Sequence, residues 1–256
     1  MLRIFSQNTN GLRARIRYGF EKTIDELKPE IICLSEVRAN ASQLPSHFLP
    51  DYEKYFSVHN TPGYAGAAIF VRSDIPKPLF ILDDFPENDE PGRVCIADFK
   101  YFKLISAYVP NSGGKLEKLD NRMAWQDKLY KYIKNVSQLK PVIYTGDLNC
   151  APTKFDTACP TVRAGCSSRE RQAFNDLLDL GMKDVFREIH PKEHGYTWYS
   201  NTYDSRAAGN GMRIDHFIIS DELMGGVHDC NVINDDKFIC KSDHNPIVLD
   251  LDLKFD

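Results

Sequence analysis

The sequence predicts an α/β fold in which two β-sheets pack face to face and helices lie outside them. Three observations support this prediction. Short apolar runs bounded by turn residues recur along the chain, only a few helical patterns separate them, and no linker divides the chain. Because 256 residues at 42% hydrophobic and 27% charged suffice for a sizeable core, we expect one domain spanning residues 1–256.

Eight segments read as strands because they are short, apolar and rich in Ile, Val, Phe and Tyr. They are 2–6, 30–35, 65–72, 94–99, 103–109, 141–145, 213–220 and 246–253. Three segments show helical spacing: 17–28, 115–138 and 167–180. The predicted inner face of 115–138 consists of Leu119, Met123, Tyr130 and Ile133. Ser167 or Ser168, followed by Glu170, predicts the start of the third helix.

Composition and charge exclude several classes of protein. No apolar run reaches the roughly 18 residues of a membrane helix, and the N-terminal segment lacks the features of a secretory signal. We therefore expect an intracellular protein, cytoplasmic or nuclear, with no membrane partner. The net charge of −4 argues against tight binding of nucleic acid through bulk charge, although a local basic face stays open.

The chain has seven irregularly spaced cysteines, which favours free thiols in a reducing compartment over a disulfide framework. A weaker alternative is a zinc site, for which the candidate ligands are Cys150, Cys159, Cys166, His190 and His194. No CxxC pair supports that site.

Acidic, amide and imidazole side chains lie at the ends of the apolar runs. They are Asn8, Asn10, Glu36, Asp147, Asn149, Asp215, Asp243 and His244. Taken singly, each is compatible with an ordinary turn or cap. If the strand ends converge, however, one cavity gathers the oxygen ligands that Mg²⁺ prefers and the groups that phosphodiester hydrolysis requires. The chain contains no GxxxxGK[ST], GxSxG or HExxH motif.

Ten segments together form a specific pattern: QNTNGLRAR, PEIICLSEVR, GYAGAAIFVR, GRVCIADF, AYVPNSG, GDLN, SSRERQAF, YTWYSN, MRIDHFIIS and SDHNPIVL. This pattern resembles the exonuclease III and AP-endonuclease branch of the endonuclease/exonuclease/phosphatase superfamily, over nearly the whole chain. The resemblance implies a four-layer α/β/β/α sandwich of two mixed sheets. It also implies a DNA repair nuclease that uses Mg²⁺, with Mn²⁺ as a substitute, to hydrolyse the phosphodiester 5′ to an abasic site.

The resemblance further implies a role for each matching residue. The side chains around the metal would be Asn8, Asn10, Glu36, Asp147, Asn149, Asp243 and His244. Asp147 would position or deprotonate the attacking water, and Asn149 would hydrogen-bond to water or phosphate. His244, oriented by Asp215, would donate to a non-bridging phosphate oxygen. Tyr108 would help to stabilise the leaving group.

Other matching residues imply how DNA is held. Trp198, Met212 and Ile214 would form the walls of a pocket for a flipped-out abasic sugar, too small for an intact base. The candidate contacts to the DNA backbone are Arg13, Arg15, Arg38, Asn111, Lys115 and Arg163. The expected partner is thus duplex DNA with abasic sites or 3′ ends, bound by a monomer.

Some positions depart from the family pattern. Asn10 stands where many relatives have Asp, Met212 where an aromatic is frequent, and Gly114 where some relatives place an Arg that inserts into the duplex. The 150–166 loop is shorter than usual. These departures bear on DNA binding and on exonuclease strength more than on the chemistry.

Two alternatives stay open: another metal-dependent phosphoesterase of this fold, acting on RNA or on inositol or lipid phosphates, and a non-catalytic DNA-binding relative. The sequence also leaves open the balance of AP incision, 3′→5′ exonuclease and 3′-phosphatase activity, and whether one or two metals act.

Overall fold

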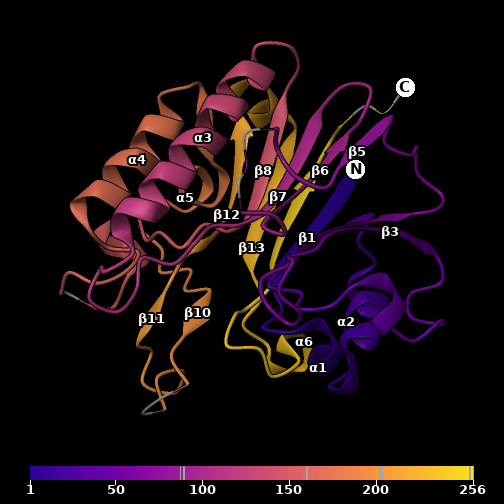
Figure 1. Cartoon of the computed structure of the whole chain (residues 1–256), viewed down its shortest axis with the longest axis horizontal. Coiled ribbons are helices and arrows are strands. Elements are labelled where there is room, and N and C mark those ends of the chain that lie inside the picture. The colour runs from indigo at the N-terminus through magenta and orange to yellow at the C-terminus, as the bar shows by residue number, and fades with distance from the viewer. Residues whose placement is uncertain (87, 89, 160, 202–203, 254, 256) are drawn as a thin grey trace.

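The structure is a computed structural model that describes residues 1–86, 88, 90–159, 161–201, 204–253 and 255. Within these residues two six-stranded mixed sheets pack against each other, as Figure 1 shows. The strand order is β13-β14-β1-β2-β4-β3 in the first sheet and β5-β6-β7-β8-β12-β9 in the second. In each sheet the central pair is parallel, β1 with β2 and β7 with β8, and the remaining pairs are antiparallel.

The first sheet contains β1 (Leu2–Asn8), β2 (Ile31–Ser35), β3 (Tyr52–Ser57), β4 (Ala67–Arg72), β13 (Val227–Val232) and β14 (Ile247–Leu251). The second contains β5 (Phe80–Leu82), β6 (Val94–Asp98), β7 (Lys103–Tyr108), β8 (Val142–Asp147), β9 (Met182–Asp184) and β12 (Asp215–Ser220). A two-stranded hairpin, β10 (Trp198–Tyr199) and β11 (Gly211–Met212), projects from the body in Figure 1.

The α-helices are α1 (Leu12–Arg17), α2 (Phe20–Leu27), α3 (Leu119–Ser137), α4 (Ser168–Leu178), α5 (Val185–Ile189) and α6 (Asp236–Ile239). Short 3-10 helices are η1 (Ala41–Gln43), η2 (Lys154–Asp156) and η3 (Asp221–Gly226). No helix in the described ranges is both long and apolar enough to cross a bilayer.

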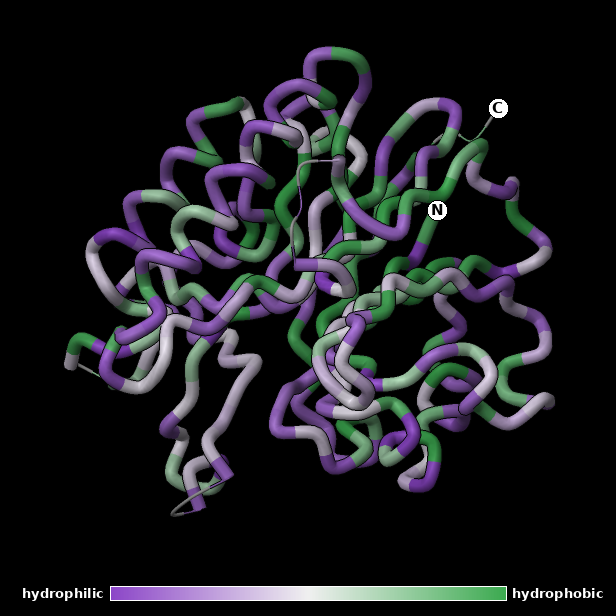
Figure 2. The backbone as a smooth tube through the Cα atoms, viewed as in Figure 1, coloured by the Kyte–Doolittle hydropathy of each residue, from purple (hydrophilic) through white to green (hydrophobic). Residues whose placement is uncertain are grey.

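Alternate side chains of the central strands face opposite layers, because successive strand residues point to opposite faces. Between the sheets lies a buried core that includes Ile4, Ile31, Ile69, Leu104, Ile143, Phe217 and Ile219. In Figure 2 the strands at the centre are accordingly the most hydrophobic part of the tube, whereas the outer helical turns are hydrophilic. The central strands are thus buried on both faces.

The opposite faces of the two sheets are covered by helices. Phe20 and Ile24 of α2 pack with Phe70 of β4 in one outer cluster. On the other side, α3 and α4 pack over Tyr144 of β8 and Ile218 of β12. These layers confirm the four-layer α/β/β/α prediction.

All eight predicted strand segments form strands, but β3, β5, β9 and β13 escaped prediction, as did the β10–β11 hairpin. Each of those four strands lies at an edge of its sheet. An edge strand exposes more of its surface, as the pattern of β5 shows, where Phe80 is 69% exposed. The sequences of β3, β9 and β13 mix polar with apolar residues, and β5 is only three residues long, so none of them gives the long apolar run of a central strand.

The helix predictions were partly correct. The segment 167–180 forms α4, and Ser167 accepts a hydrogen bond from the Glu170 amide while Glu170 accepts one from the Ser167 amide. This reciprocal capping box fixes the N-terminus. The predicted segment 17–28 contains α2, but α1 precedes it and was missed.

The predicted inner face of 115–138 was correct for Ile133 and wrong for its other three residues. The helix starts at Leu119, and its buried residues are Arg122, Trp125, Gln126, Leu129 and Ile133, with Leu119, Met123 and Tyr130 only half-buried at its margin. The face is rotated because Arg122 turns inward to a buried ion pair with Glu170.

The cysteines, all of which lie in the described ranges, are free thiols. Cys159 is partly exposed and the other six are buried. Cys33 and Cys95 lie in the core between the two sheets.

The double-sided burial of the central strands predicts a large difference between two Phe-to-Ala substitutions. Phe217→Ala opens a cavity between the sheets and should lower the free energy of unfolding by about 3–5 kcal/mol. Phe80→Ala, on exposed β5, should lower it by less than about 1 kcal/mol. Urea denaturation of the two variants measures both values, and equal losses would contradict the assigned core.

Candidate active site

The register of the strands gathers the predicted site residues at one end of the sandwich. In the second sheet, Asp147 of β8 is paired with Tyr108 of β7 on one side and with Asp215 of β12 on the other. In the first sheet, Asn8 at the end of β1 lies beside Ser35 at the end of β2. Glu36 therefore emerges next to Asn8, as the convergence of strand ends requires.

Asn8 links the two sheets. Its side-chain nitrogen donates to Glu36 Oε2 at 3.0 Å and to Asp147 Oδ2 at 2.9 Å. Asn8 is 1% exposed, and its Oδ1 accepts a hydrogen bond from the backbone amide of Asn10. One buried amide thus holds a carboxylate from each sheet at a fixed separation.

Backbone conformation aims the side chains at this end of the sandwich. Asn10, Glu36 and Asn149 all have positive φ, at 43°, 52° and 48°. Asn tolerates this left-handed region, whereas Glu rarely adopts it, and such outliers cluster at functional sites. Gly146, before Asp147, has φ 126° and leaves no room for a side chain against the Ala107 carbonyl. The Gly of GDLN is therefore required by packing.

His244 and two aspartates form a compact group. Nδ1 of His244 lies 2.8 Å from Asp215 Oδ2, and Nε2 of His244 lies 3.9 Å from Asp147 Oδ2. Within the described part of the chain, these three are the one set of three or more His, Cys, Asp or Glu residues whose possible ligand atoms all lie within 4.8 Å of one another. Cys150, Cys159, Cys166, His190 and His194 form no such set there, so the zinc alternative gains no support.

Burial and charge shift the titration of this group. Burial lowers the pKa of His244, but the Asp215 carboxylate outweighs it and raises that pKa to about 10. Burial and the repulsion of Asp215 raise the pKa of Asp147 to about 7, against the opposing effect of His244. An imidazolium and a readily protonated carboxylate thus lie side by side near neutral pH.

The remaining carboxylates are held by neighbouring donors. Arg38 is ion-paired with Glu36. Asp243 accepts hydrogen bonds from Asn10 Nδ2 at 2.9 Å and from Trp198 Nε1 at 3.3 Å. Neighbouring protein donors therefore orient both carboxylates.

The donor set fits a hard divalent cation. Asp147 and Asp215 are both 2% exposed, and Asp215 Oδ1 is buried with no hydrogen-bond partner among the described residues. Burial, and after it the repulsion of the Asp215 carboxylate, raises the pKa of Asp147. Oxygen ligands with a surplus of negative charge are what Mg²⁺ and similar cations need.

A cleft of about 700 Å³ opens above this group. The predicted site residues that line it are Asn10, Glu36, Arg38, Tyr108, Asn111, Asp147, Asn149, Arg163, Trp198, Met212, Ile214, Asp243 and His244. Thr161, Val162, Ala164 and Gly165 also line it and were not predicted; Gly114 lies on its wall. The sequence carried no signal for the first four beyond the length of their loop.

One end of the cleft is apolar. Met212 and Ile214 are buried in a small cluster, against which Trp198 packs. The guanidinium of Arg163 lies 5.5 Å from the centre of the Trp198 ring. The cleft thus combines an acidic floor with an apolar pocket beside it.

The other predicted residues lie outside the cleft lining. Asn8 and Asp215 do not line the cleft but contact residues that do: Asn8 donates to Glu36 and Asp147, and Asp215 bonds to His244. Arg13 and Lys115 are exposed. Arg15, which was also predicted to contact the DNA backbone, is 8% exposed, and its guanidinium carbon lies 5.6 Å from the centre of the Tyr18 ring. It lies on the inner face of α1, a short helix that periodicity did not reveal.

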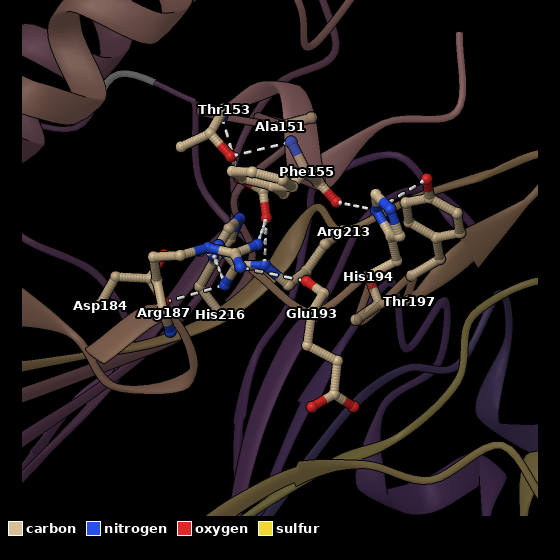
Figure 3. Close-up of polar contacts among 12 residues, drawn as sticks. Ala151, Thr153, Phe155, Asp184, Arg187, Glu193, His194, Thr197, Arg213 and His216 are labelled. Carbon is tan, nitrogen blue, oxygen red and sulfur yellow. Dashed lines mark hydrogen bonds and ion pairs between the residues drawn. The ribbon is translucent and has the colours of Figure 1, made fainter. Parts of the chain in front are cut away.

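A buried ionic network lies next to the pocket wall in sequence; Figure 3 shows its members Arg213, Asp184 and Arg187. Arg213 donates to Asp156 Oδ1 at 2.7 Å and to Asp184 Oδ2 at 2.6 Å. Arg187 also pairs with Asp156. Since Arg213 stands between the wall residues Met212 and Ile214, this network ties them to the 150–166 loop. Arg213 therefore has two buried carboxylate partners, Asp156 and Asp184.

Glu170 is a second anchor that sequence reasoning missed. It is fully buried, accepts from Ser112 Oγ at 2.6 Å and from the Gly165 amide at 3.0 Å, and pairs with Arg122 at 2.8 Å. Arg122 in turn donates to the Leu148 carbonyl at 2.9 Å. One carboxylate thus holds the loops that follow β7 and β8. The segment SSRERQAF contained Glu170 but did not reveal this role.

Comparison with known proteins fits this geometry. The family described as "Endonuclease/Exonuclease/phosphatase family" matches residues 5–244. The chain belongs to that family. It is 35% identical to an exodeoxyribonuclease of Bacillus subtilis, over 97% of this chain and 98% of that protein. It is also 33% identical to the DNA repair nuclease APEX1 of Danio rerio, over 97% of this chain and 81% of that protein.

Solved structures agree with the fold. The structure of an AP endonuclease from Archaeoglobus fulgidus superposes with a TM-score of 0.86 at 28% identity. The superposition covers 99% of this chain and all of the other.

The contact between His244 and Asp215 predicts a measurable titration. In metal-free protein we expect the His244 imidazolium to persist to about pH 10, as its raised pKa requires. Because a raised folded-state pKa stabilises the folded state below the unfolded value near 6.5, that contribution is lost as the pH rises through about 10. In Asp215→Asn the opposing effect of burial should lower the pKa. NMR titration of His244 in both proteins measures this, and an unchanged pKa in Asp215→Asn would contradict the assignment.

Proposed function

We propose that this chain is a divalent-metal-dependent DNA repair nuclease that hydrolyses the phosphodiester 5′ to an abasic site. The observation that carries the proposal is the joint placement of Glu36, Asp147, Asp215, Asp243 and His244 around one cleft with an apolar pocket beside it. The nuclease names of the relatives over nearly the full length support it. We also propose that residues 1–256 act as one catalytic unit and as a monomer, inside the cell.

In this proposal Glu36 and Asp243, with Asn10, would hold Mg²⁺ or Mn²⁺. The cation would neutralise the phosphate and polarise its oxygens. Without it, the carboxylates would repel the DNA backbone as well as one another.

The protein groups supply the proton transfers. Asp147 accepts a proton from the attacking water, a role that suits a carboxylate with a pKa of about 7. His244, held by Asp215, donates from Nε2 to a non-bridging phosphate oxygen. Asn149 is fixed by its bond to the Val109 carbonyl at 2.8 Å, which uses one of its two Nδ2 hydrogens. The other Nδ2 hydrogen of Asn149 can donate to the attacking water or to the phosphate. Tyr108 donates to the leaving oxygen.

The apolar pocket selects the substrate. Trp198, Met212 and Ile214 form its walls, and a sugar without a base fits there at the least cost of extrusion. Arg38, Asn111 and Arg163 lie in the cleft lining and would contact the backbone, with Arg13 and Lys115 outside it. The same centre can act at a 3′ end, which is the second activity that we propose, given the exodeoxyribonuclease among the relatives.

Substitution of the proposed base tests the chemistry. Asp147→Asn should lower the cleavage rate by at least about 100-fold, the scale of one general base. Asp127→Asn, an exposed aspartate paired with Lys131 on α3, should leave it unchanged. The assay uses a duplex with one abasic analogue and identifies the product ends. Full activity in Asp147→Asn would refute the role or the enzyme.

Removal of the cation tests the cofactor. Excess chelator should abolish cleavage while the circular dichroism spectrum stays native, and Mg²⁺ or Mn²⁺ should restore activity. Parallel incubations with intact duplex, RNA and a soluble inositol phosphate test the alternative substrates of this fold. Cleavage in chelator, or faster turnover of the phosphate ester, would overturn the proposal.

The pocket walls predict the discrimination between substrates. Trp198→Ala enlarges the pocket and also removes the bond to Asp243, so abasic cleavage should fall by about tenfold or more. Met212→Phe restores the aromatic frequent in relatives and should raise the preference for an abasic over an intact site. The ratio of kcat/KM on the two duplexes measures this. An unaltered ratio in both variants would place selection elsewhere.

A further inference from the structure

Arg93 lies directly behind Tyr108. It precedes β6, and its carbonyl accepts a hydrogen bond from the Tyr108 amide at 2.8 Å. Its Nη1 donates to the Tyr108 carbonyl at 3.3 Å. The side chain is 4% exposed and does not line the cleft. Arg93 is therefore placed to act on Tyr108 and not on a bound ligand.

The guanidinium of Arg93 lies between two phenol rings. Its central carbon is 5.2 Å from the centre of the Tyr108 ring and 5.4 Å from that of Tyr64. Such distances allow cation–π attraction, which is stronger when the cation is desolvated. Nη2 also donates to the Tyr64 hydroxyl at 2.9 Å, so Tyr64 fixes the guanidinium from its other side.

The charge of Arg93 is only partly matched. Glu90 accepts from Nη2 at 2.7 Å, but its side chain is 37% exposed. Nε is buried without a hydrogen-bond partner in the described ranges. Besides the ion pair with Glu90, the guanidinium of Arg93 contacts Tyr108 and Tyr64.

We propose that Arg93 is a positioning residue for Tyr108: stacked on its ring and bonded to its carbonyl, it fixes the direction in which the phenol hydroxyl points into the cleft. The inference rests on the proposed nuclease function, in which that hydroxyl meets the leaving oxygen. A phenol ring turns about two side-chain bonds, and a displacement of about 1 Å at a reacting group can cost up to about 100-fold in rate. Arg93 restrains both the ring and the backbone that carries it.

A double-mutant cycle tests this coupling. Arg93→Met keeps the bulk and removes the charge; it should lower kcat on the abasic duplex by about tenfold and leave KM within about twofold. Tyr108→Phe should lower kcat by a similar factor. Because Arg93 acts through the Tyr108 hydroxyl, adding Arg93→Met to Tyr108→Phe should change kcat by less than about twofold. Arg93→Lys, which keeps a cation, should recover part of the loss.

Two controls separate this role from general stabilisation. Arg72→Met removes a strand arginine paired with Glu30 and Asp74 at the far end of β4, and should leave kcat unchanged. Tyr64→Phe keeps the ring but removes its bond to Arg93, and should give a smaller loss than Arg93→Met. Melting temperatures are measured for every variant. If Arg93→Met does not fold, the cycle is run with Arg93→Lys.

The outcomes are distinct. Strict multiplication of the losses in the double variant, or an unchanged kcat in Arg93→Met, overturns the inference while the nuclease function stands. Absence of cleavage by the unmodified protein overturns the proposed function itself. A loss confined to KM would make Arg93 a contact to substrate and would also overturn the positioning role.

Discussion

The hydrogen bonds of Asn8 to Glu36 and Asp147 are the interaction on which the candidate site depends. They exist because β1, β2 and β8 end at the same edge of the sandwich and because the sheets are close enough there for one amide to reach both. The core between the sheets sets that spacing. Packing of apolar side chains far from the cleft therefore determines where the carboxylates of Glu36 and Asp147 lie. A substitution that changes the packing of the core would also change the geometry of the site.

Buried ion pairs near the Asn8 hydrogen bonds impose a second constraint on the site. The loops that follow β7 and β8 have little regular structure, yet buried charges fix them at both ends. Glu170 and Arg122 hold one side, and Arg213 with Asp156 holds the other. Breaking such a pair by removing one partner leaves an uncompensated buried charge, which is strongly unfavourable. The cleft is therefore rigid at its walls although it is built from loops.

The sequence predicted the central strands and the acidic floor well, because both leave local signals. A strand buried on two faces is a continuous apolar run, and the groups of the floor follow such runs directly. Edge strands such as β3 and β13 mix polar with apolar residues, and short helices such as α1 have too few turns for a period. Glu170 shows the deeper limit. A charged residue looks the same in sequence whether it is solvated or buried against a partner distant along the chain.

The burial of the thiols has a practical consequence. Burial raises the pKa of several cysteines, Cys95 and Cys150 among them. Hydrogen bonding with Thr161 lowers that of the partly exposed Cys159. An electrophilic dye should therefore attach to the native protein at Cys159 first, near Arg163. The chain carries its own attachment point for a fluorescent reporter next to the mouth of the cleft, without any engineered cysteine.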